Sequence, residues 1–496
     1  MTEHVEVAVV GAGFAGLGMA IALRRAGRSS FVILERAASV GGTWRDNTYP
    51  GVACDVPSHL YGFATHPNPG WSARYAAGAE IHRYLEDVAA TEDLGDRLRL
   101  QTPLLSAQWD AAASRWTLDT GRGPLTADAL VLACGRLTEP SIPDIPGLEK
   151  FDGPIFHSAR WDHGADLAGR RIAVVGTGAS AVQLMPRLAE TTAQVTLFQR
   201  TPAWIVPRDE RAYDDAERER FATHPEELAA LRAALYVEGE ARFASRSGDA
   251  AASAAARQVA LDHLAAQVPD ARLRAALTPQ YSFGCKRVLL SDDFYPAVAS
   301  PAVTLEPSAL AAVDDDGALV AASGTRHRAD ALVLATGFVS QRQPYAELVT
   351  GEQGLTLAEH WSDGMTSFAS TVVAGFPNLF VLDGPNASLG HNSSVLMLEE
   401  QAAYAVRALA QRAQAPGGVL RVDPQAEAAY TAEIDRAART TPWLTGGCRN
   451  WYVDRGRLTL LWPGTVDAFR ARLARADGTE FTTIPATAGG DERRSS

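Results

Sequence analysis

Two stretches of the chain combine short apolar runs with a glycine-rich turn and a helical pattern. In the first, an apolar run at 5–10 precedes the turn at 11–16, small and apolar residues recur at helical spacing over 17–25, and 31–34 is apolar again. In the second, the runs at 171–175 and 194–198 flank a turn at 176–181 and a helical pattern over 181–188. Each stretch predicts a β-α-β unit, in which a helix joins two parallel strands.

Two further segments resemble each other. Residues 128–135 and 330–337 both begin Asp-Ala-Leu-Val-Leu-Ala and end in Gly. We expect each to be a short buried strand that carries the chain between the two units. Residues 209–280 instead are rich in Ala, Arg and Glu, and helical periodicity is clear at 226–236 and 251–268. The polar tail at 486–496 is expected to be disordered.

These patterns predict an α/β fold with two Rossmann-like dinucleotide-binding domains and a helical insertion. We expect one discontinuous domain over 1–142 and 341–496, a second over 152–208 and 281–340, and the insertion over 209–280. A length of 496 residues suits two or three domains rather than one core.

Composition excludes several classes of protein. Apolar residues make up 46% and charged residues 21%, as in soluble globular proteins. A net charge of −12 disfavours nucleic acid as a partner. No apolar run approaches the roughly 18 residues of a membrane span, and the start at Met1 is polar and acidic, unlike a secretory signal. We therefore expect a cytoplasmic protein without a membrane partner.

The cysteines Cys54, Cys134, Cys285 and Cys448 lie far apart in the sequence. They form no CxxC pair and no spacing typical of metal ligands. This pattern predicts four free thiols, no metal site and no redox-active dithiol.

The first glycine-rich turn indicates a site for FAD. Gly11, Gly13 and Gly16 follow a strand and open a helix, and Glu35 lies 24 positions after Gly11. Such glycines let the backbone approach a pyrophosphate at the helix N-terminus, and the acidic residue accepts hydrogen bonds from ribose hydroxyls. A carboxylate there favours a ribose without a 2′-phosphate.

The second turn, with Gly176, Gly178 and Ser180, indicates NADPH. The position equivalent to Glu35 is Arg200, followed by the hydroxyl of Thr201. A guanidinium binds a 2′-phosphate bidentately, although Arg200 is also explained as a surface charge at a strand end. Two such sites predict hydride transfer from NADPH to FAD. Because the chain has no CxxC pair, oxygen is the expected electron acceptor.

The segment between the two units carries the pattern FxGxxxHxxxWD, formed by Phe151, Gly153, His157, Trp161 and Asp162. It resembles the fingerprint of type I Baeyer–Villiger monooxygenases, a group of class B flavoprotein monooxygenases. Related flavin-containing monooxygenases usually carry Tyr or Phe in place of the final Trp-Asp. Further segments similar to this family lie at 41–44, 54–55, 199–202, 285–287, 335–338 and 375–380, so the resemblance runs from about residue 5 to about residue 475.

The resemblance implies a mechanism. FAD reduced by NADPH captures O2 as a C4a-peroxyflavin, which attacks a ketone and gives an ester or lactone. Arg287 is the implied catalytic cation, and Asp55 is the acidic partner that orients it. Lys286 is implied to share the 2′-phosphate with Arg200 and Thr201. Without the resemblance, Lys286 and Arg287 are more simply explained as a solvated basic pair at a strand end.

Other site residues follow from the same resemblance. Thr43, Trp44 and Tyr61 are expected around the flavin, although Trp44 and Tyr61 also suit an ordinary core. Asn392 lies in a polar turn before a helix over 395–409, whose N-terminus suits the flavin pyrimidine oxygens; capping of that helix explains the same turn. His157 is expected to hold a hinge that couples NADPH binding to closure rather than to transfer protons.

Two alternatives stay open at this point. A flavin monooxygenase that oxygenates sulfur or nitrogen would use the same cofactors, and an FAD/NADPH oxidase or sensor would bind both nucleotides without oxygenating a substrate. Arg287 and the Trp161-Asp162 ending favour the Baeyer–Villiger reaction, with a small-molecule ketone and O2 as the reaction partners. The sequence does not specify which ketone.

Overall fold

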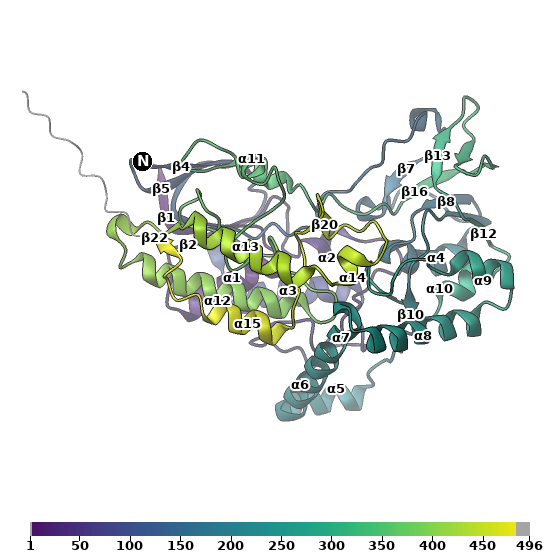
Figure 1. The fold of residues 1–496 in the computed structure, drawn as a ribbon, viewed down its shortest axis with the longest axis horizontal. Coiled ribbons are helices and arrows are strands. Elements are labelled where there is room, and N and C mark those ends of the chain that lie inside the picture. Colours follow the sequence, from purple (N-terminus) through teal and green to yellow (C-terminus); the bar gives the residue numbers. More distant parts are fainter. Residues whose placement is uncertain (1, 483–496) are drawn as a thin grey trace, which may run out of the picture.

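The fold is built on two separate sheets, one mixed and one parallel, which lie in opposite halves of the molecule (Figure 1). The computed structural model describes residues 2–482, so the tail expected to be disordered lies outside the described residues. Among the described residues no helix is long and apolar enough to cross a membrane.

The first sheet has eight strands in the order β17-β4-β5-β6-β1-β2-β3, with β18 paired to β6. Its strands are β1 (Glu3–Val10), β2 (Phe31–Leu34), β3 (Leu98–Arg99), β4 (Leu104–Asp110), β5 (Arg115–Thr120), β6 (Gly123–Leu132), β17 (Val349–Thr350) and β18 (Leu379–Val381). Val9 of β1 lies in register between Ile33 and Val131. Residues of β1 are buried on both faces, which explains its near-continuous apolar run.

The second sheet has five parallel strands in the order β12-β9-β8-β16-β7. They are β7 (Ile155–His157), β8 (Arg171–Val175), β9 (Gln194–Phe198), β12 (Val303–Glu306) and β16 (Ala331–Leu334). A small antiparallel sheet of β13 (Leu310–Val313), β14 (Leu319–Ala321) and β15 (Arg326–His327) projects beside it. The strands expected at 31–34, 171–175 and 194–198 have the predicted bounds.

Helices cover the faces of both sheets (Figure 1). The first sheet carries α1 (Phe14–Arg25), α2 (Thr43–Asp46), α3 (Gly78–Thr91), α11 (Leu357–His360), α12 (Ser394–Arg412), α13 (Pro424–Ala438) and α15 (Val466–Ala474), and the second carries α4 (Ala179–Thr191) and α10 (Phe294–Ala299). The remaining short strands are β10 (Ile205–Val206), β11 (Leu289–Leu290), β19 (Arg421–Val422), β20 (Val453–Asp454), β21 (Arg457–Leu458) and β22 (Phe481–Thr482). In Figure 1, β20 and α14 (Pro442–Thr445) lie between the two halves.

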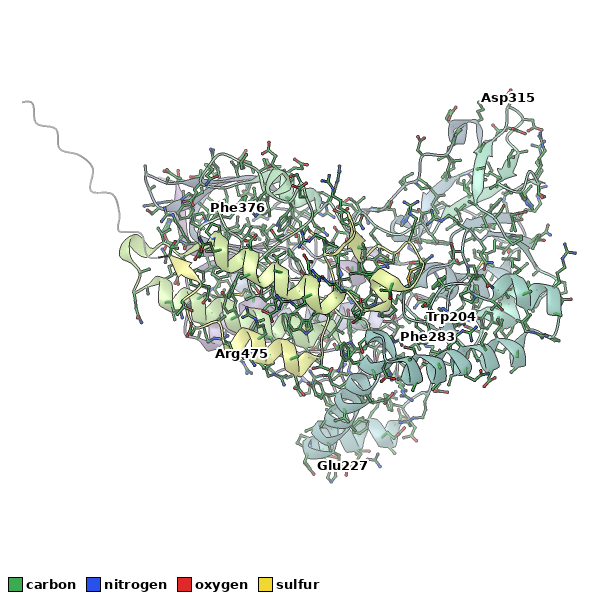
Figure 2. The ribbon with its side chains drawn as sticks, in the orientation of Figure 1. Trp204, Glu227, Phe283, Asp315, Phe376 and Arg475 are labelled. Atoms are coloured by element: carbon green, nitrogen blue, oxygen red, sulfur yellow. A yellow bond between two sulfur atoms is a disulfide. The ribbon has the colours of Figure 1, made fainter. Side chains whose placement is uncertain are left out.

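The expected helical insertion forms α5 (Asp215–Thr223), α6 (Pro225–Ala241), α7 (Phe243–Ser247), α8 (Ala250–Gln267) and α9 (Ala271–Leu277). Where α8 meets the second half of the molecule, Trp204 and Phe283 lie close together (Figure 2), with ring centroids 5.9 Å apart. At its other end the insertion contacts the first half, because Glu240 of α6 accepts a hydrogen bond from the backbone N of Val466 at 3.0 Å. The insertion therefore bridges the two halves.

The two linkers between the sheets lie against each other. The chain leaves the first sheet after β6 and returns from the second after β16, as the repeated segments predicted. Ser141 N donates to Gly337 O at 2.8 Å, and Thr336 Oγ1 donates to Ser141 O at 2.6 Å. The two linkers are thus joined to each other by hydrogen bonds where they pass between the sheets.

The prediction of four free thiols is wrong. Cys285 and Cys448 form a disulfide across a sequence separation of 163, while Cys54 and Cys134 are free. Sequence spacing could not show this pair, because the fold brings the segment after the insertion against the loop after α14.

Candidate active site

One large cavity runs from the first sheet to the second, with a volume of about 1430 Å³. It is lined by every predicted catalytic and cofactor-binding residue except Gly16: Gly11, Gly13, Glu35, Thr43, Trp44, Asp55, Tyr61, Gly176, Gly178, Ser180, Arg200, Thr201, Lys286, Arg287 and Asn392. The structure therefore gathers into one space residues that are up to 381 positions apart in sequence.

The first glycine-rich turn lies between β1 and α1 and has no room for a side chain at Gly11 or Gly16. Gly11 has φ +105°, and a Cβ there would lie 2.4 Å from the carbonyl oxygen of Ala133. A Cβ on Gly16 would lie 1.9 Å from the carbonyl oxygen of Gly11, so Gly16 permits the packing of helix on strand. Gly13 precedes α1 without any side-chain cap, which leaves the first-turn N–H groups for an anion.

Glu35 follows β2 at the edge of the cavity and is buried. Its carboxylate accepts hydrogen bonds from the backbone N of Ala12 and of Ala37, both at 2.9 Å. Arg45 Nη1 donates to it at 3.1 Å. These contacts fix the carboxylate in place at the cavity wall, as a ribose-binding acid requires.

The second turn repeats this construction between β8 and α4. Gly176 has φ +116°, and a Cβ there would lie 2.4 Å from the carbonyl oxygen of Ala335. Gly178 precedes α4 without a side-chain cap, and a Cβ on it would meet no atom within 4 Å. Both turns thus expose an uncapped helix N-terminus beside the cavity.

A smaller cavity of about 240 Å³ adjoins the end of β9 and is lined by Arg200, Thr201 and Lys286, among others. Lys286 is half-buried, and its Nζ lies 5.0 Å from the ring centroid of Tyr281. Burial, and then the nearby charge of Arg200, lower the pKa of Lys286. The predicted 2′-phosphate residues therefore lie together, and the positive field between them favours an anion.

Arg287 and Asp55 form a bidentate ion pair at the cavity wall. Arg287 donates from Nε to Oδ2 at 2.8 Å and from Nη2 to Oδ1 at 2.7 Å. The charge of Asp55 raises the pKa of Arg287. Burial acts to raise the pKa of Asp55, but the adjacent Arg287 and the nearby Arg208 outweigh it and hold that pKa below its usual value. Both groups stay ionised, and the guanidinium is held in one orientation.

Aromatic side chains line the part of the cavity beside the first turn. Trp44 Nε1 donates to the hydroxyl of Tyr61 at 3.2 Å, and the Tyr61 ring lies 5.0 Å from that of Phe14. Thr43 begins α2 next to them. Trp44 and Tyr61 therefore belong both to the cavity wall and to the adjoining core.

The polar turn before α12 also reaches the cavity, but its residues have structural partners. Ser393 caps the helix, accepting from the backbone N of Val395 at 3.3 Å. The Asn392 side chain donates to Glu240 at 2.9 Å and to the carbonyl oxygen of Tyr236 at 3.2 Å. The helix is capped as the alternative interpretation held, and Asn392 in addition joins the insertion to the cavity wall.

The residues of the FxGxxxHxxxWD pattern do not line either cavity. Phe151 is buried in the core beside the second sheet, and a Cβ on Gly153 would lie 2.2 Å from the carbonyl oxygen of Asp330. The Trp161 ring packs on Phe156 at 4.9 Å. Asp162 accepts from the backbone N of Gly164 at 2.8 Å. The pattern shapes β7 and the turn that follows it.

His157 ends β7 and lies against the returning linker. Its Nδ1 accepts from the backbone N of Ala159 at 3.0 Å, and its ring lies 5.9 Å from that of Phe338. Burial lowers the pKa of His157 to about 4. A neutral, buried imidazole outside the cavity offers no proton to the site. The hinge role expected from the sequence stays a prediction.

Several cavity residues were missed by the sequence analysis. Arg136 pairs with Asp383, and Gln183 accepts from the Tyr49 hydroxyl at 2.8 Å and donates to the carbonyl oxygen of Ala53 at 2.9 Å. Arg136 directly follows one of the repeated strands, which was a usable signal. Gln183 lies within an ordinary helical pattern, so the sequence carries no signal for it. Its two hydrogen bonds nevertheless join α4 to the loop that contains Tyr49 and Ala53.

The fold and the cavity define a flavoprotein oxidoreductase with two dinucleotide sites, and comparison with known proteins agrees. A family model described as pyridine nucleotide-disulphide oxidoreductase matches residues 8–214. A Baeyer–Villiger monooxygenase of Streptomyces coelicolor is 46% identical over 97% of this chain and 93% of its own length. A Baeyer–Villiger monooxygenase of Pseudomonas aeruginosa is 40% identical over 99% of this chain and 94% of its own length.

Solved structures agree with these relatives. An oxidized steroid monooxygenase bound to NADP superposes with a TM-score of 0.85 at 29% identity, covering 97% of this chain and 99% of that one. The chain belongs to the Baeyer–Villiger monooxygenase family. The predicted fold class and enzyme class are confirmed.

Proposed function

We propose that this chain converts a ketone into an ester or lactone, with Arg287 as the catalytic cation and Asp55 as the residue that orients it. The overall reaction consumes a ketone, O2, NADPH and a proton and gives the ester, NADP⁺ and water. The observation that carries the proposal is the bidentate Asp55–Arg287 pair on the wall of a cavity that joins the two glycine-rich turns.

FAD and NADPH are the cofactors of this family, and the residues present fit them. Each glycine-rich turn has an uncapped helix N-terminus and a position where a side chain would clash with backbone or intrude on the cavity. Glu35 would hold the ribose of FAD, while Arg200, Thr201 and Lys286 would hold the 2′-phosphate of NADPH. When bound, FAD supplies the activation of oxygen after reduction by NADPH.

Arg287 acts as a fixed positive charge. Addition to a ketone carbonyl places negative charge on oxygen, and a preorganised cation stabilises that charge without the cost of reorganisation. Asp55 keeps the guanidinium in place through two hydrogen bonds. Neither residue needs to gain or lose a proton during the reaction.

The proposal also includes the limits of the two nucleotide-binding domains and the hinge between them. We assign 1–142 and 341–496 to FAD, 152–208 and 281–340 to NADPH, and 209–280 to the insertion, with His157 packed on the linker at the boundary. The paired linkers and the Tyr49–Gln183 hydrogen bond at 2.8 Å lie at the boundary between these units. Motion of one unit against the other stays a prediction. A cytoplasmic location remains a prediction.

The test is product analysis with NADPH and O2 on a panel of ketones and thioethers. We expect the wild type to form esters or lactones, and Arg287→Ala to lose at least about 100-fold in ester formation, the range for removal of one oxyanion stabiliser. NADPH oxidation should continue, with hydrogen peroxide as product. Ester formation at near the wild-type rate in Arg287→Ala would contradict the assignment.

Arg171→Ala is the matched control. Arg171 also pairs with an aspartate, Asp330, at 2.6 Å, but it is exposed and does not line the cavity. Its loss should leave ester formation unchanged. Sulfoxide formation from thioethers without ester formation from any ketone would favour the alternative class of flavin monooxygenase.

A further inference from the structure

The smaller cavity contains a cation that the sequence analysis did not assign. Besides Arg200, Thr201 and Lys286, its wall includes Tyr281, Gly447, Cys448 and Arg449. Arg449 comes from the loop after α14, which enters the space between the two halves of the molecule from the C-terminal part of the chain. Three cationic side chains from three separate segments therefore surround one cavity.

Among the described residues, no negatively charged side chain lines this cavity. No Asp or Glu is among its lining residues, and within residues 2–482 neither Arg200, Lys286 nor Arg449 has a carboxylate oxygen within 4.0 Å. By contrast, Arg455, in the turn between β20 and β21, pairs with Asp363 at 2.8 Å. In a chain of net charge −12, an acid-free group of three cations is unusual and indicates a site for an anion.

The disulfide links the two segments that carry Lys286 and Arg449. Cys285 directly precedes Lys286, and Cys448 directly precedes Arg449. The Cα atoms of the two cysteines are 6.2 Å apart, so the loop that carries Arg449 is covalently fixed to the segment that carries Lys286 and Arg287. An exposed loop arginine is ordinarily free to leave a site, and this bond restricts it.

We infer that Arg449 is a third cationic ligand of the 2′-phosphate of NADPH, held at that site by the Cys285–Cys448 disulfide. The inference extends the proposed NADPH site and rests on it. Arg449 adds a charge-assisted contact that NADH cannot make, so it determines specificity between the two nucleotides.

The first test is binding of adenosine 2′,5′-bisphosphate and of adenosine 5′-monophosphate, measured by calorimetry on the FAD-loaded protein. In Arg449→Gln we expect the Kd of the bisphosphate to rise about 5- to 30-fold, as for one charged contact, with the Kd of the monophosphate unchanged. The ratio of kcat/KM for NADPH over NADH should fall by a similar factor. Arg455→Gln is the control and should change neither.

These outcomes separate the inference from the proposed function. The binding measurement does not need a ketone, so it reports on Arg449 even if no ester is formed. An unchanged Kd for the bisphosphate in Arg449→Gln would overturn the inference. An equal rise in the Kd of the bisphosphate and of the monophosphate would also overturn it. Such a result would mean that the substitution disturbs the loop as a whole rather than a contact with the 2′-phosphate.

The disulfide is tested separately with Cys448→Ser. We expect the Kd of the bisphosphate to rise in this variant, and the wild type to show the same rise after reduction by dithiothreitol. Reductant should have no further effect on Cys448→Ser. If binding is the same with and without the disulfide, the bond does not hold Arg449 at the phosphate.

Discussion

Glu35 and Arg200 occupy the same place in two copies of one structural unit, and they differ in charge. Each lies 24 positions after the first glycine of its turn. Glu35 is buried and fixed by three donors, whereas Arg200 is exposed beside a second cation. In the proposed assignment, the residue at the end of the second strand has the charge that suits a bare ribose in one unit and a phosphorylated ribose in the other. Both cofactors of the family could therefore be predicted from the sequence.

His59 is a residue whose burial links stability to pH. Its ring packs 5.0 Å from Tyr213 and 4.9 Å from Phe221, and neither ring nitrogen has a hydrogen-bond partner within residues 2–482. Burial, with the nearby charges of Arg211 and Arg232, lowers the pKa of His59 to about 4. As pH falls below the ordinary value of 6.5, the unfolded chain takes up the proton first, so stability is lost between 6.5 and about 4.

His59→Phe should reduce this loss of stability in acid. The substitution keeps an aromatic ring in the cluster and removes two unsatisfied nitrogens. We expect the variant to recover about 2 kcal/mol at pH 5, seen as a smaller fall in Tm between pH 7.5 and pH 5. His163→Phe, at an exposed histidine, is the control. If the Tm of His59→Phe falls as much as that of the wild type, His59 is not a cause of the loss of stability in acid.

At the scale of elements, the contact between α6 and the turn before α12 positions one wall of the cavity. Gly239 of α6 lies against Asn392, and a Cβ on Gly239 would lie 2.6 Å from the Asn392 side chain. The amide is already held by Glu240 and by the carbonyl oxygen of Tyr236. The helix therefore needs a glycine there despite the usual cost of glycine in a helix.

Gly239→Ala should destabilise the protein, although alanine favours helices. Overpacking costs about 1–3 kcal/mol, and the gain in helix propensity is about 1 kcal/mol, so we expect a lower Tm and weaker retention of FAD. Gly390→Ala is the control, because a Cβ there meets no atom within 4 Å. When Asn392 is also replaced by alanine, Gly239→Ala should raise Tm instead of lowering it. If Gly239→Ala still lowers Tm in that background, a contact other than the one with Asn392 is responsible.

Elements were predictable where local pattern determines them. The strands at 31–34, 171–175 and 194–198 and the helices of the insertion follow from apolar runs and periodicity. The contact of α6 with Asn392 and the position of Gln183 depend on segments far apart in sequence, which no local pattern records. The FxGxxxHxxxWD residues were predictable as a family signature, but their placement outside the cavity was not, because a signature does not state whether it serves chemistry or packing.

At the scale of the whole molecule, the disulfide closes a loop that passes through both sheets. The chain between Cys285 and Cys448 contains β12 and β16 of the second sheet and β17 and β18 of the first. The expectation of four free thiols came from the spacing of the cysteines and from composition. Neither shows which cysteines far apart in sequence the fold brings together. The cross-link therefore ties the stability of one half of the molecule to that of the other.

Cys448→Ser should lower global stability as well as nucleotide binding. Closing a loop of 163 residues removes entropy from the unfolded chain worth about 5 kcal/mol in the loop-closure treatment, an upper value for the effect. We expect the variant to unfold at a lower denaturant concentration than the wild type, and reductant to shift the wild type to the position of the variant. The unfolding transition should also broaden or divide in two, because the halves are no longer covalently closed on each other.

A thiol count makes this prediction decisive. Unfolded, non-reduced wild type should expose two reactive thiols, Cys54 and Cys134, and four after reduction. Cys448→Ser should expose three under both conditions, since Cys285 is then free. If the wild type shows four thiols before reduction, the bond is absent, and the coupling of the two halves must then come from noncovalent contacts such as the Tyr49–Gln183 hydrogen bond. If the wild type shows two thiols but Cys448→Ser unfolds at the same denaturant concentration as the wild type, the bond is present without adding to global stability. Its role would then be limited to holding Arg449 in place.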